Sequence, residues 1–208
     1  MTGRFITLEG GEGAGKSTQA KRLAAALAAH GVDCMVTREP GGSPGAEEIR
    51  KLLVEGAPGR WDPVTETLLL FAARADHIAR KIKPTLAVGT WVISDRFTDS
   101  TYAYQGAGRG LDRETIRRIE AASTHAFRPE LTLVLDLPPE TGLARAAARN
   151  SSETRFEGFD LAFHAKLREA FRDIVQREPD RCVFVDATGT EDKVAELIWR
   201  TVASKFSI

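Results

Sequence analysis

The feature that most constrains this chain is an eight-residue run, Gly10-Gly-Glu-Gly-Ala-Gly-Lys-Ser17, which matches the pattern GxxxxGK[ST] at every fixed position. A β-prone run precedes it at 4–8, and an amphipathic helical pattern follows it at 17–30. In that setting glycines let backbone N–H groups surround phosphate oxygens at the positive end of a helix. The run predicts a nucleotide-phosphate site at a strand-to-helix turn, and a glycine-rich turn that only starts a helix is the alternative.

The residues of this loop have expected roles in binding ATP and Mg²⁺. Lys16 is expected along the β- and γ-phosphates, and the Ser17 hydroxyl beside Mg²⁺. Asp95 closes an apolar strand, where a carboxylate would support the metal partly through water, and Glu9 would order metal-bound water or position an arginine. For both acids an ion pair with a neighbouring arginine is the alternative. The loop residues expected to bind ATP are Gly10, Gly11, Glu12, Gly13, Ala14, Gly15, Lys16, Ser17 and Thr18.

Short β-rich runs alternate with helical periods along the chain, which is typical of a parallel sheet covered by helices. We therefore expect one α/β domain over 1–208, a three-layer P-loop fold with a five-stranded parallel sheet. Segment 96–111 is rich in glycine and polar residues, so we expect irregular structure there; segment 149–158 joins two helices and lacks apolar periodicity, so we expect a mobile loop or lid. Strands are predicted at 4–8, 32–38, 91–95, 131–137 and 182–186, and helices at 17–30, 46–54, 63–88, 112–125, from 138 onward and around 194–202. The helix at 63–88 carries an apolar stripe on one face, which could belong to the core or to a subunit interface: Leu68, Phe71, Ala75, Ile78 and Ile82.

Charge and composition limit the kinds of partner. Lys and Arg together number 29, as do Asp and Glu, so no overall attraction to nucleic acid or a membrane surface is expected. No apolar run approaches the roughly 20 residues that span a bilayer. The two cysteines, Cys34 and Cys182, are too far apart in sequence to suggest a zinc site or a disulfide framework. These features predict a cytoplasmic protein without nucleic-acid or membrane partners.

The phosphate loop alone does not name a reaction, because GTPases, motor ATPases and small kinases share it. Three further motifs follow expected strands or lie on the long helix: TREPGG at 37–42, DRF at 95–97 leading into STYAYQG at 100–106, and FAAR at 71–74. The carboxyl ends of parallel strands face the ligand crevice. A guanine-reading NKxD-like motif and long motor insertions are absent from the sequence. The arginines of these motifs favour a small kinase whose acceptor is itself anionic.

In their order and spacing, these motifs resemble the thymidylate kinase family over almost the whole chain. The resemblance implies a P-loop kinase, usually a homodimer, that uses ATP and Mg²⁺ to convert dTMP into dTDP for dTTP synthesis. It also implies that Phe71 stacks on thymine, that Arg74 hydrogen-bonds the base, and that Tyr102 lies beneath the sugar. Arg38, Arg50 and Arg96 would surround the acceptor phosphate. The full set implied to bind dTMP is Arg38, Glu39, Arg50, Phe71, Arg74, Arg96, Ser100, Thr101, Tyr102 and Gln105.

Several of these residues have plainer interpretations. Periodicity alone would make Phe71 a core residue, and Arg50 a solvated charge on a short helix. Tyr102 and Gln105 could be ordinary loop residues. Arg96 follows Asp95, the last residue of a predicted strand that ends at the crevice. A functional role is therefore favoured for Arg96 even without the resemblance to the family.

The lid is expected to supply a cation. One class of the family carries an arginine in the phosphate loop, at the position of Gly13 here, so in this chain the cation should come from 149–158. Arg155 in the segment TRFE resembles the lid arginine of the bacterial-type class, and Arg149 is a second candidate. Arg145 could stack on adenine near the turn at 187–189; charges on a solvated helix are the alternative for Arg145 and Arg149.

Two rival functions stay open at this point. One is another nucleoside monophosphate kinase, or a deoxynucleoside kinase, on the same scaffold. The other is a nucleotide-dependent switch that binds ATP without transferring phosphate.

Overall fold

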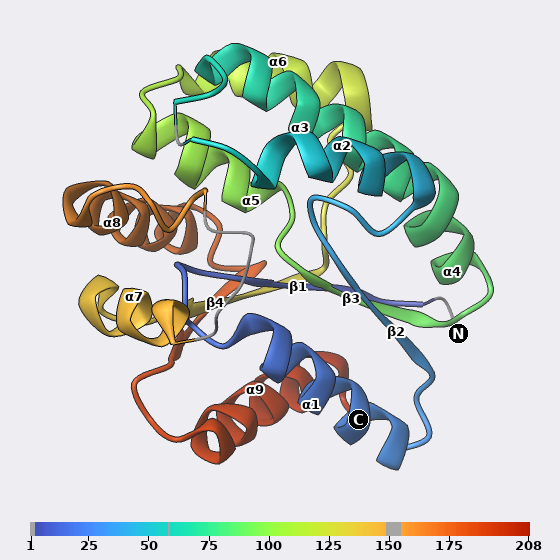
Figure 1. The fold of residues 1–208 in the computed structure, drawn as a ribbon. Helices are drawn as coiled ribbons and strands as arrows, with labels where there is room; N and C mark the ends of the chain where they lie inside the picture. The colour runs from blue at the N-terminus through green and yellow to red at the C-terminus, as the bar shows by residue number, and fades with distance from the viewer. Residues whose placement is uncertain (1–2, 58, 149–154) are drawn as a thin grey trace.

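A computed structural model describes residues 3–57, 59–148 and 155–208, and it contains one five-stranded sheet in the order β2-β3-β1-β4-β5 (Figure 1). Every described pairing is parallel; in the centre, Leu8 of β1 lies in register with Asp95 of β3 and Leu133 of β4. The predicted strands and the α/β fold class are confirmed. The strands are β1 (Phe5–Glu9), β2 (Cys34–Arg38), β3 (Trp91–Asp95), β4 (Leu131–Asp136) and β5 (Cys182–Asp186).

Helices cover both faces of the sheet (Figure 1). On one face lie α1 (Lys16–Ala29) and α9 (Glu191–Phe206), which pack against each other. On the other face lie α3 (Pro63–His77), α6 (Arg113–Thr124) and α8 (Leu161–Arg177). Asp62, Asp112 and Asp160 cap these three helices by accepting first-turn N–H groups. The shorter helices are α2 (Pro44–Val54), α4 (Lys83–Ala87), α5 (Thr98–Thr101) and α7 (Pro139–Ala147).

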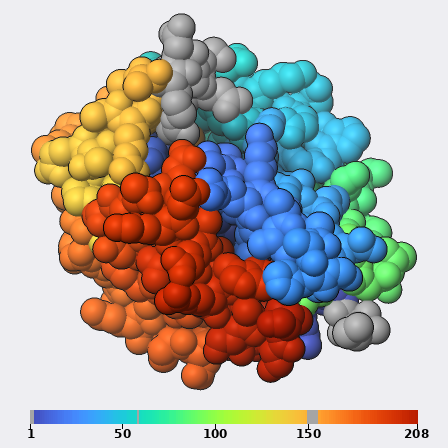
Figure 2. All heavy atoms as spheres, turned by 90° about the horizontal axis from the view of Figure 1, so that it is seen from below, coloured from blue at the N-terminus to red at the C-terminus, as the bar shows by residue number. Residues whose placement is uncertain are grey.

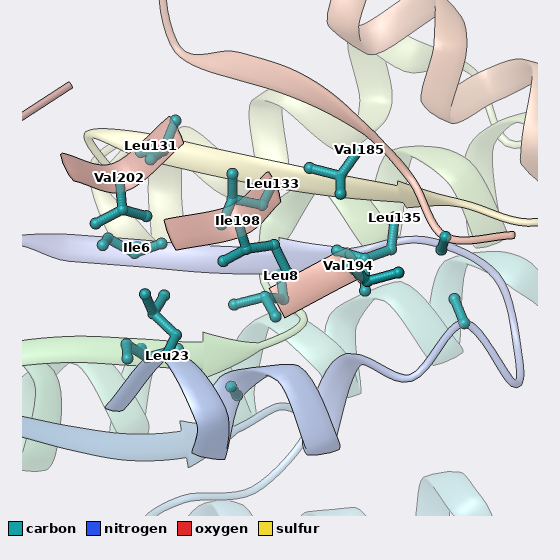
Figure 3. Close-up of a cluster of buried hydrophobic side chains, with 14 of the residues drawn as sticks. Ile6, Leu8, Leu23, Leu131, Leu133, Leu135, Val185, Val194, Ile198 and Val202 are labelled. Carbon is teal, nitrogen blue, oxygen red and sulfur yellow. The ribbon is translucent and has the colours of Figure 1, made fainter. Parts of the chain in front are cut away.

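The core consists of two main apolar layers, one on each face of the sheet. Alternate residues of a strand point to opposite faces, so Ile6 and Leu8 of β1 pack toward α1 and α9, with Leu23 and Ile198 (Figure 3). Phe5, one residue before Ile6, points to the other face, where its ring centroid lies 4.9 Å from that of Phe97. Apolar packing therefore covers both faces of the sheet from which the loops at its carboxyl edge emerge.

The long helix predicted at 63–88 is helical but not uniform. A π-helical segment, Ile78–Ile82, joins α3 to α4 and changes the angular position of later residues. Of the predicted apolar stripe, Phe71, Ile78 and Ile82 are buried in the core, whereas Leu68 is 51% exposed. Glu66, Arg74 and His77 are buried on this helix instead, because polar partners from other segments meet them there.

Segment 96–111 is also more regular than predicted. It forms α5 and a π-helical segment, Tyr102–Gly108, so the expectation of irregular structure was wrong. Apolar periodicity did not reveal it because its buried face includes polar side chains such as Thr101 and Gln105. Only 155–158 of the predicted lid belong to the described residues. None of the helices that the structure describes is long and apolar enough to cross a membrane.

Candidate active site

The phosphate loop runs from the end of β1 into α1, as its sequence predicts. Gly13 has a φ of 67°, and a Cβ there would come within 1.9 Å of the carbonyl oxygen of Gly142 in α7, so only glycine fits. Lys16 Nζ donates to the carbonyl oxygens of Gly10 at 3.2 Å and Gly11 at 2.7 Å. Burial and then Arg96 lower the pKa of Lys16 to about 8. The loop therefore holds its lysine along its own backbone.

Ser17 and Asp95 meet at the edge of this loop. The Ser17 hydroxyl donates a hydrogen bond to the Asp95 carboxylate. Mg²⁺ commonly takes one or two carboxylates together with phosphate oxygens and water, so this pair of oxygen ligands fits the ion. The described residues contain no group of three His, Cys, Asp or Glu that could hold a metal by themselves.

Glu9 accepts hydrogen bonds from the segment that follows β3. Its Oε1 accepts from the backbone N–H groups of Phe97 at 2.8 Å and Ser100 at 3.2 Å, and its Oε2 from the Ser100 hydroxyl at 2.5 Å. Burial, and next the charge of Asp99, raise the pKa of Glu9 to about 7. Glu9 thus anchors the start of α5, and so positions the residues that follow β3.

Arg96 bridges the phosphate loop and the segment after β3. Its Nη1 donates to the Gly10 carbonyl and to the Ser100 hydroxyl, each at 3.1 Å, and its Nη2 contacts Glu12 Oε1 at 2.9 Å. The guanidinium also lies over the ring of Tyr104, 4.8 Å from its centroid. Burial opposes ionisation of Glu12, but Arg96 and Lys16 outweigh it and lower its pKa to about 2. Arg96 has a φ of 69°, a backbone strain of a kind that concentrates at functional sites.

A cavity opens beside Arg96, between α2, α3 and the segment after β3. It brings together seven of the residues that the sequence suggested for dTMP: Glu39, Arg50, Arg74, Arg96, Ser100, Thr101 and Gln105. Glu12 of the phosphate loop lines it too, so the cavity and the loop are continuous. Lining residues that the sequence did not suggest are Pro40, Val54, Leu70, Phe97, Tyr104, Phe156 and Glu157.

Arg74 lines this cavity and is held in place by several hydrogen bonds. Its Nε donates to Glu39 Oε2 at 2.7 Å, its Nη1 to the Thr101 hydroxyl at 3.2 Å and its Nη2 to the Phe97 carbonyl at 3.1 Å. The guanidinium lies over the ring of Phe71, 4.7 Å from its centroid. Arg74 is therefore fixed in orientation by three elements, as a residue that reads a ligand needs to be.

Three of the suggested residues do not line this cavity. Phe71 is buried in the core beneath Arg74, and Arg38 is exposed in an ion pair with Glu47 at 3.2 Å. Tyr102 points to the opposite side, where its hydroxyl donates to Glu120 at 2.6 Å.

The helical form of 98–108 explains why Tyr104 lines the cavity in place of Tyr102. Ser100, Thr101, Tyr104 and Gln105 share one face of that helical segment, and Tyr102 lies on the other. Helical spacing of the run STYAYQG separates Tyr102 from Tyr104 in this way, whereas the sequence predicted irregular structure there.

The structure does not bring Arg155 to the phosphate loop. Arg155 is buried in an ion pair with Glu66, and it donates to the carbonyl oxygens of Leu53 at 2.8 Å and Ala57 at 3.1 Å near the end of α2. A buried carboxylate draws it there, so the expectation of a phosphate contact is not met in this geometry. Arg149, the other lid candidate, lies outside the described residues.

A second cavity adjoins the loop on the side where α1, α7 and α9 lie beside one another (Figure 2). Gly13, Gly15 and Thr18 line it, together with Arg145 and Gly189. Arg145 Nη1 lies 3.5 Å from the Ala187 carbonyl. The arrangement joins the expected adenine-side residues to the phosphate loop.

Comparison with known proteins decides the family. The profile of the thymidylate kinase family, described as "Thymidylate kinase", matches residues 8–198. The chain belongs to the thymidylate kinase family. It is 55% identical over 206 residues to a thymidylate kinase of Caulobacter vibrioides, covering 99% of each chain. It is 50% identical to one of Magnetococcus marinus, covering 100% of this chain and 99% of the other.

A solved thymidylate kinase has the same fold. The crystal structure of the Ehrlichia chaffeensis thymidylate kinase aligns with a TM-score of 0.77 at 31% identity, covering 97% of this chain and 99% of that one. The resemblance to the thymidylate kinase family noted from the motifs is therefore confirmed, as is the P-loop kinase fold.

Proposed function

We propose that this chain transfers the γ-phosphoryl group of ATP to dTMP, giving dTDP and ADP for dTTP biosynthesis. The observation that carries the proposal is the position of Arg96. Its side chain contacts the phosphate loop and also lines the cavity between α2, α3 and the segment after β3, here called the acceptor cavity. Membership of the thymidylate kinase family supports the choice of thymidylate. The acceptor cavity, with its arginines and buried polar residues, supports an anionic nucleotide.

Catalysis by this site is positioning and charge stabilisation. A nucleotide phosphate is already ionised near neutral pH, so the reaction needs no strong general base. Arg96 and Lys16 place positive charge between the two substrates, where the repulsion of two polyanions would otherwise oppose in-line approach. Arg50 lies at the acceptor cavity and donates to the Pro40 carbonyl, so its charge faces the acceptor side.

Ser17 and Asp95 would hold Mg²⁺, with Asp95 acting partly through water. The ion, when bound, would neutralise charge on the transferred phosphoryl group. Thr18 and Arg145 would belong to the ATP side, in the second cavity.

Arg74, Thr101, Ser100 and Gln105 would read the polar edge of the base, and Glu39 would hold Arg74 in place. Tyr104, which the cavity includes, takes the proposed role beneath the sugar in place of Tyr102. Phe71 would act through Arg74, whose guanidinium it supports.

The lid cation remains a proposal, now centred on Arg149. Glu66 holds Arg155 in the described geometry, which leaves Arg149 as the other candidate from the predicted lid.

A homodimer is proposed as well: Val64 and Leu68, one turn apart on α3, and Leu52 on the adjoining α2 are exposed apolar residues. The proposed location is the cytoplasm.

A coupled assay across acceptors tests the proposal. With ATP and Mg²⁺, kcat/KM should be highest for dTMP among dTMP, dUMP, UMP, CMP and dGMP. Equal or faster turnover of an acceptor without thymine would refute the substrate assignment. If no acceptor is phosphorylated and calorimetry detects no dTMP binding, a nucleotide-dependent switch would be the better description.

A further inference from the structure

Glu66, a residue that the reaction scheme above leaves unused, is a fully buried carboxylate in the first turn of α3. Its Oε2 forms ion pairs with Arg109, at 3.0 Å, and with Arg155. Its Oε1 accepts from Nε2 of Gln105 at 2.7 Å. One buried carboxylate therefore contacts Arg109 at the end of the π-helical segment Tyr102–Gly108, Arg155, and Gln105 of the acceptor cavity.

Glu66 lies between two guanidinium groups, which can only donate hydrogen bonds, so its carboxylate oxygens act as acceptors. An ionised carboxylate can accept hydrogen bonds but cannot donate one. The two ends of a glutamine amide have nearly the same shape, so the neighbouring charge decides which end faces which partner. The NH₂ group of Gln105 must face Glu66.

This leaves the carbonyl oxygen of Gln105 for the cavity that Gln105 lines. Among the described residues, that oxygen has no hydrogen-bond donor. A carbonyl oxygen in a cavity selects a ligand that offers an N–H group. Thymine and uracil carry a hydrogen on N3, between two carbonyl groups, whereas N3 of cytosine has a lone pair that would repel the oxygen.

We infer that Glu66 is a specificity-determining positioning residue, which fixes Gln105 as a hydrogen-bond acceptor and so favours an imide base over cytosine. The inference rests on the proposed function, because it assumes that the base of the acceptor enters this cavity. The selection for an imide base originates at Glu66, which does not touch the nucleotide. Glu66 acts by orienting the amide group of Gln105, which does.

Glu66→Gln tests the orientation. The new amide would offer its oxygen to Arg109 and Arg155 and its NH₂ group to Gln105, so Gln105 would turn its own NH₂ group toward the cavity. The ratio of kcat/KM for dTMP to that for dCMP should fall at least about tenfold, because an unmatched polar group in a hydrogen-bonding site is strongly rejected. Glu66→Asp keeps the negative charge and should keep the preference for dTMP, even if activity is lower.

A purely structural role would lower both rates together and leave the ratio unchanged. Glu120→Gln is the matched control, because Glu120 is also buried, pairs with Arg128 at 2.9 Å and accepts from Tyr102, away from this cavity. The ratio of kcat/KM for dTMP to that for dCMP should be the same in Glu120→Gln as in the wild type. Thermal melting of each variant shows whether it is folded.

A double-mutant cycle with Gln105→Ala tests whether the effect of Glu66 on base preference passes through Gln105. If Glu66 acts through Gln105, Gln105→Ala should lower the ratio, and adding Glu66→Gln should have no further effect on it. An unchanged ratio in Gln105→Ala, or in a folded Glu66→Gln protein, would overturn the inference; the Gln105→Ala result decides should Glu66→Gln fail to fold. Failure of the wild-type enzyme to phosphorylate dTMP would instead refute the proposed function.

Discussion

At the scale of single residues, Tyr104 shows how a side chain acquires its role from the helical phase of its segment. It lies in the acceptor cavity beneath Arg96 and donates its hydroxyl to Glu12 at 2.8 Å. Tyr102, two residues earlier, faces Glu120 and the core between α6 and α8. Two tyrosines of the same short run thus belong to different parts of the molecule.

This contrast gives a prediction about sugar selection. Tyr104→Ala should reduce the preference for dTMP over its ribonucleotide counterpart by about tenfold, because removing the ring opens space for a 2′-hydroxyl. Tyr102→Ala should leave the preference unchanged. The measurement is kcat/KM for both nucleotides with each variant, and the reverse pattern would return the role to Tyr102.

Glu9 provides a prediction about pH and stability. Its pKa is raised from 4.5 to about 7 in the folded protein, first by burial and then by Asp99. The folded state therefore binds more protons than the unfolded state between these values, and stability falls as the pH rises through this range. Below pH 4.5 the contribution of Glu9 is fully present, and above about pH 7 it is lost.

Urea unfolding of the wild type and Glu9→Gln between pH 4.5 and 8 measures this contribution. The stability of the wild type relative to the variant should decline with rising pH by about 3 kcal/mol, since one pKa unit corresponds to about 1.4 kcal/mol. A difference that stayed constant or grew with pH would show that Glu9 is not held in a protonation-sensitive site.

At the scale of elements, the parts of the fold that the sequence predicted are those with apolar patterning. Each strand is largely apolar and contains β-branched or aromatic residues, and the phosphate loop between β1 and α1 has a sequence pattern of its own. The helical segment 98–108 was missed because its buried face carries the polar Thr101 and Gln105, whose hydrogen-bond partners come from distant residues. The sequence does not predict a role for Glu66 for the same reason, since the residues around it in the sequence do not distinguish a buried carboxylate from an exposed one.

The lid gives a prediction in which two arginines have different effects. Arg155→Met removes a buried partner of Glu66 but leaves Arg109, so it should cost about 2 kcal/mol and lower Tm by about 5 °C. Arg149→Met should lower kcat at least about tenfold with little change in Tm, as the loss of a charge-stabilising group does. Calorimetric melting and steady-state kinetics on both variants test this assignment. A tenfold fall in kcat for Arg155→Met at unchanged Tm would restore Arg155 as the lid cation.

At the scale of the whole molecule, one rigid sheet presents two cavities on either side of a single phosphate loop. Glu12 lines the acceptor cavity, and Gly13 lines the cavity between α1, α7 and α9. A donor and an acceptor bound in these places would bring their phosphates together at Lys16 and Arg96. The order of the strands agrees with this division, because Glu39 and Arg96 follow β2 and β3 on one side of β1, and Arg145 and Gly189 follow β4 and β5 on the other.

The most direct test of this account is the stoichiometry of the reaction with its two substrates. The purified protein with ATP, Mg²⁺ and dTMP should form dTDP and ADP in equal amounts, separated and measured by anion-exchange chromatography. Omitting dTMP should reduce ADP formation to a small fraction of that rate. ADP formation with free phosphate, at a rate independent of dTMP and without dTDP, would contradict the account.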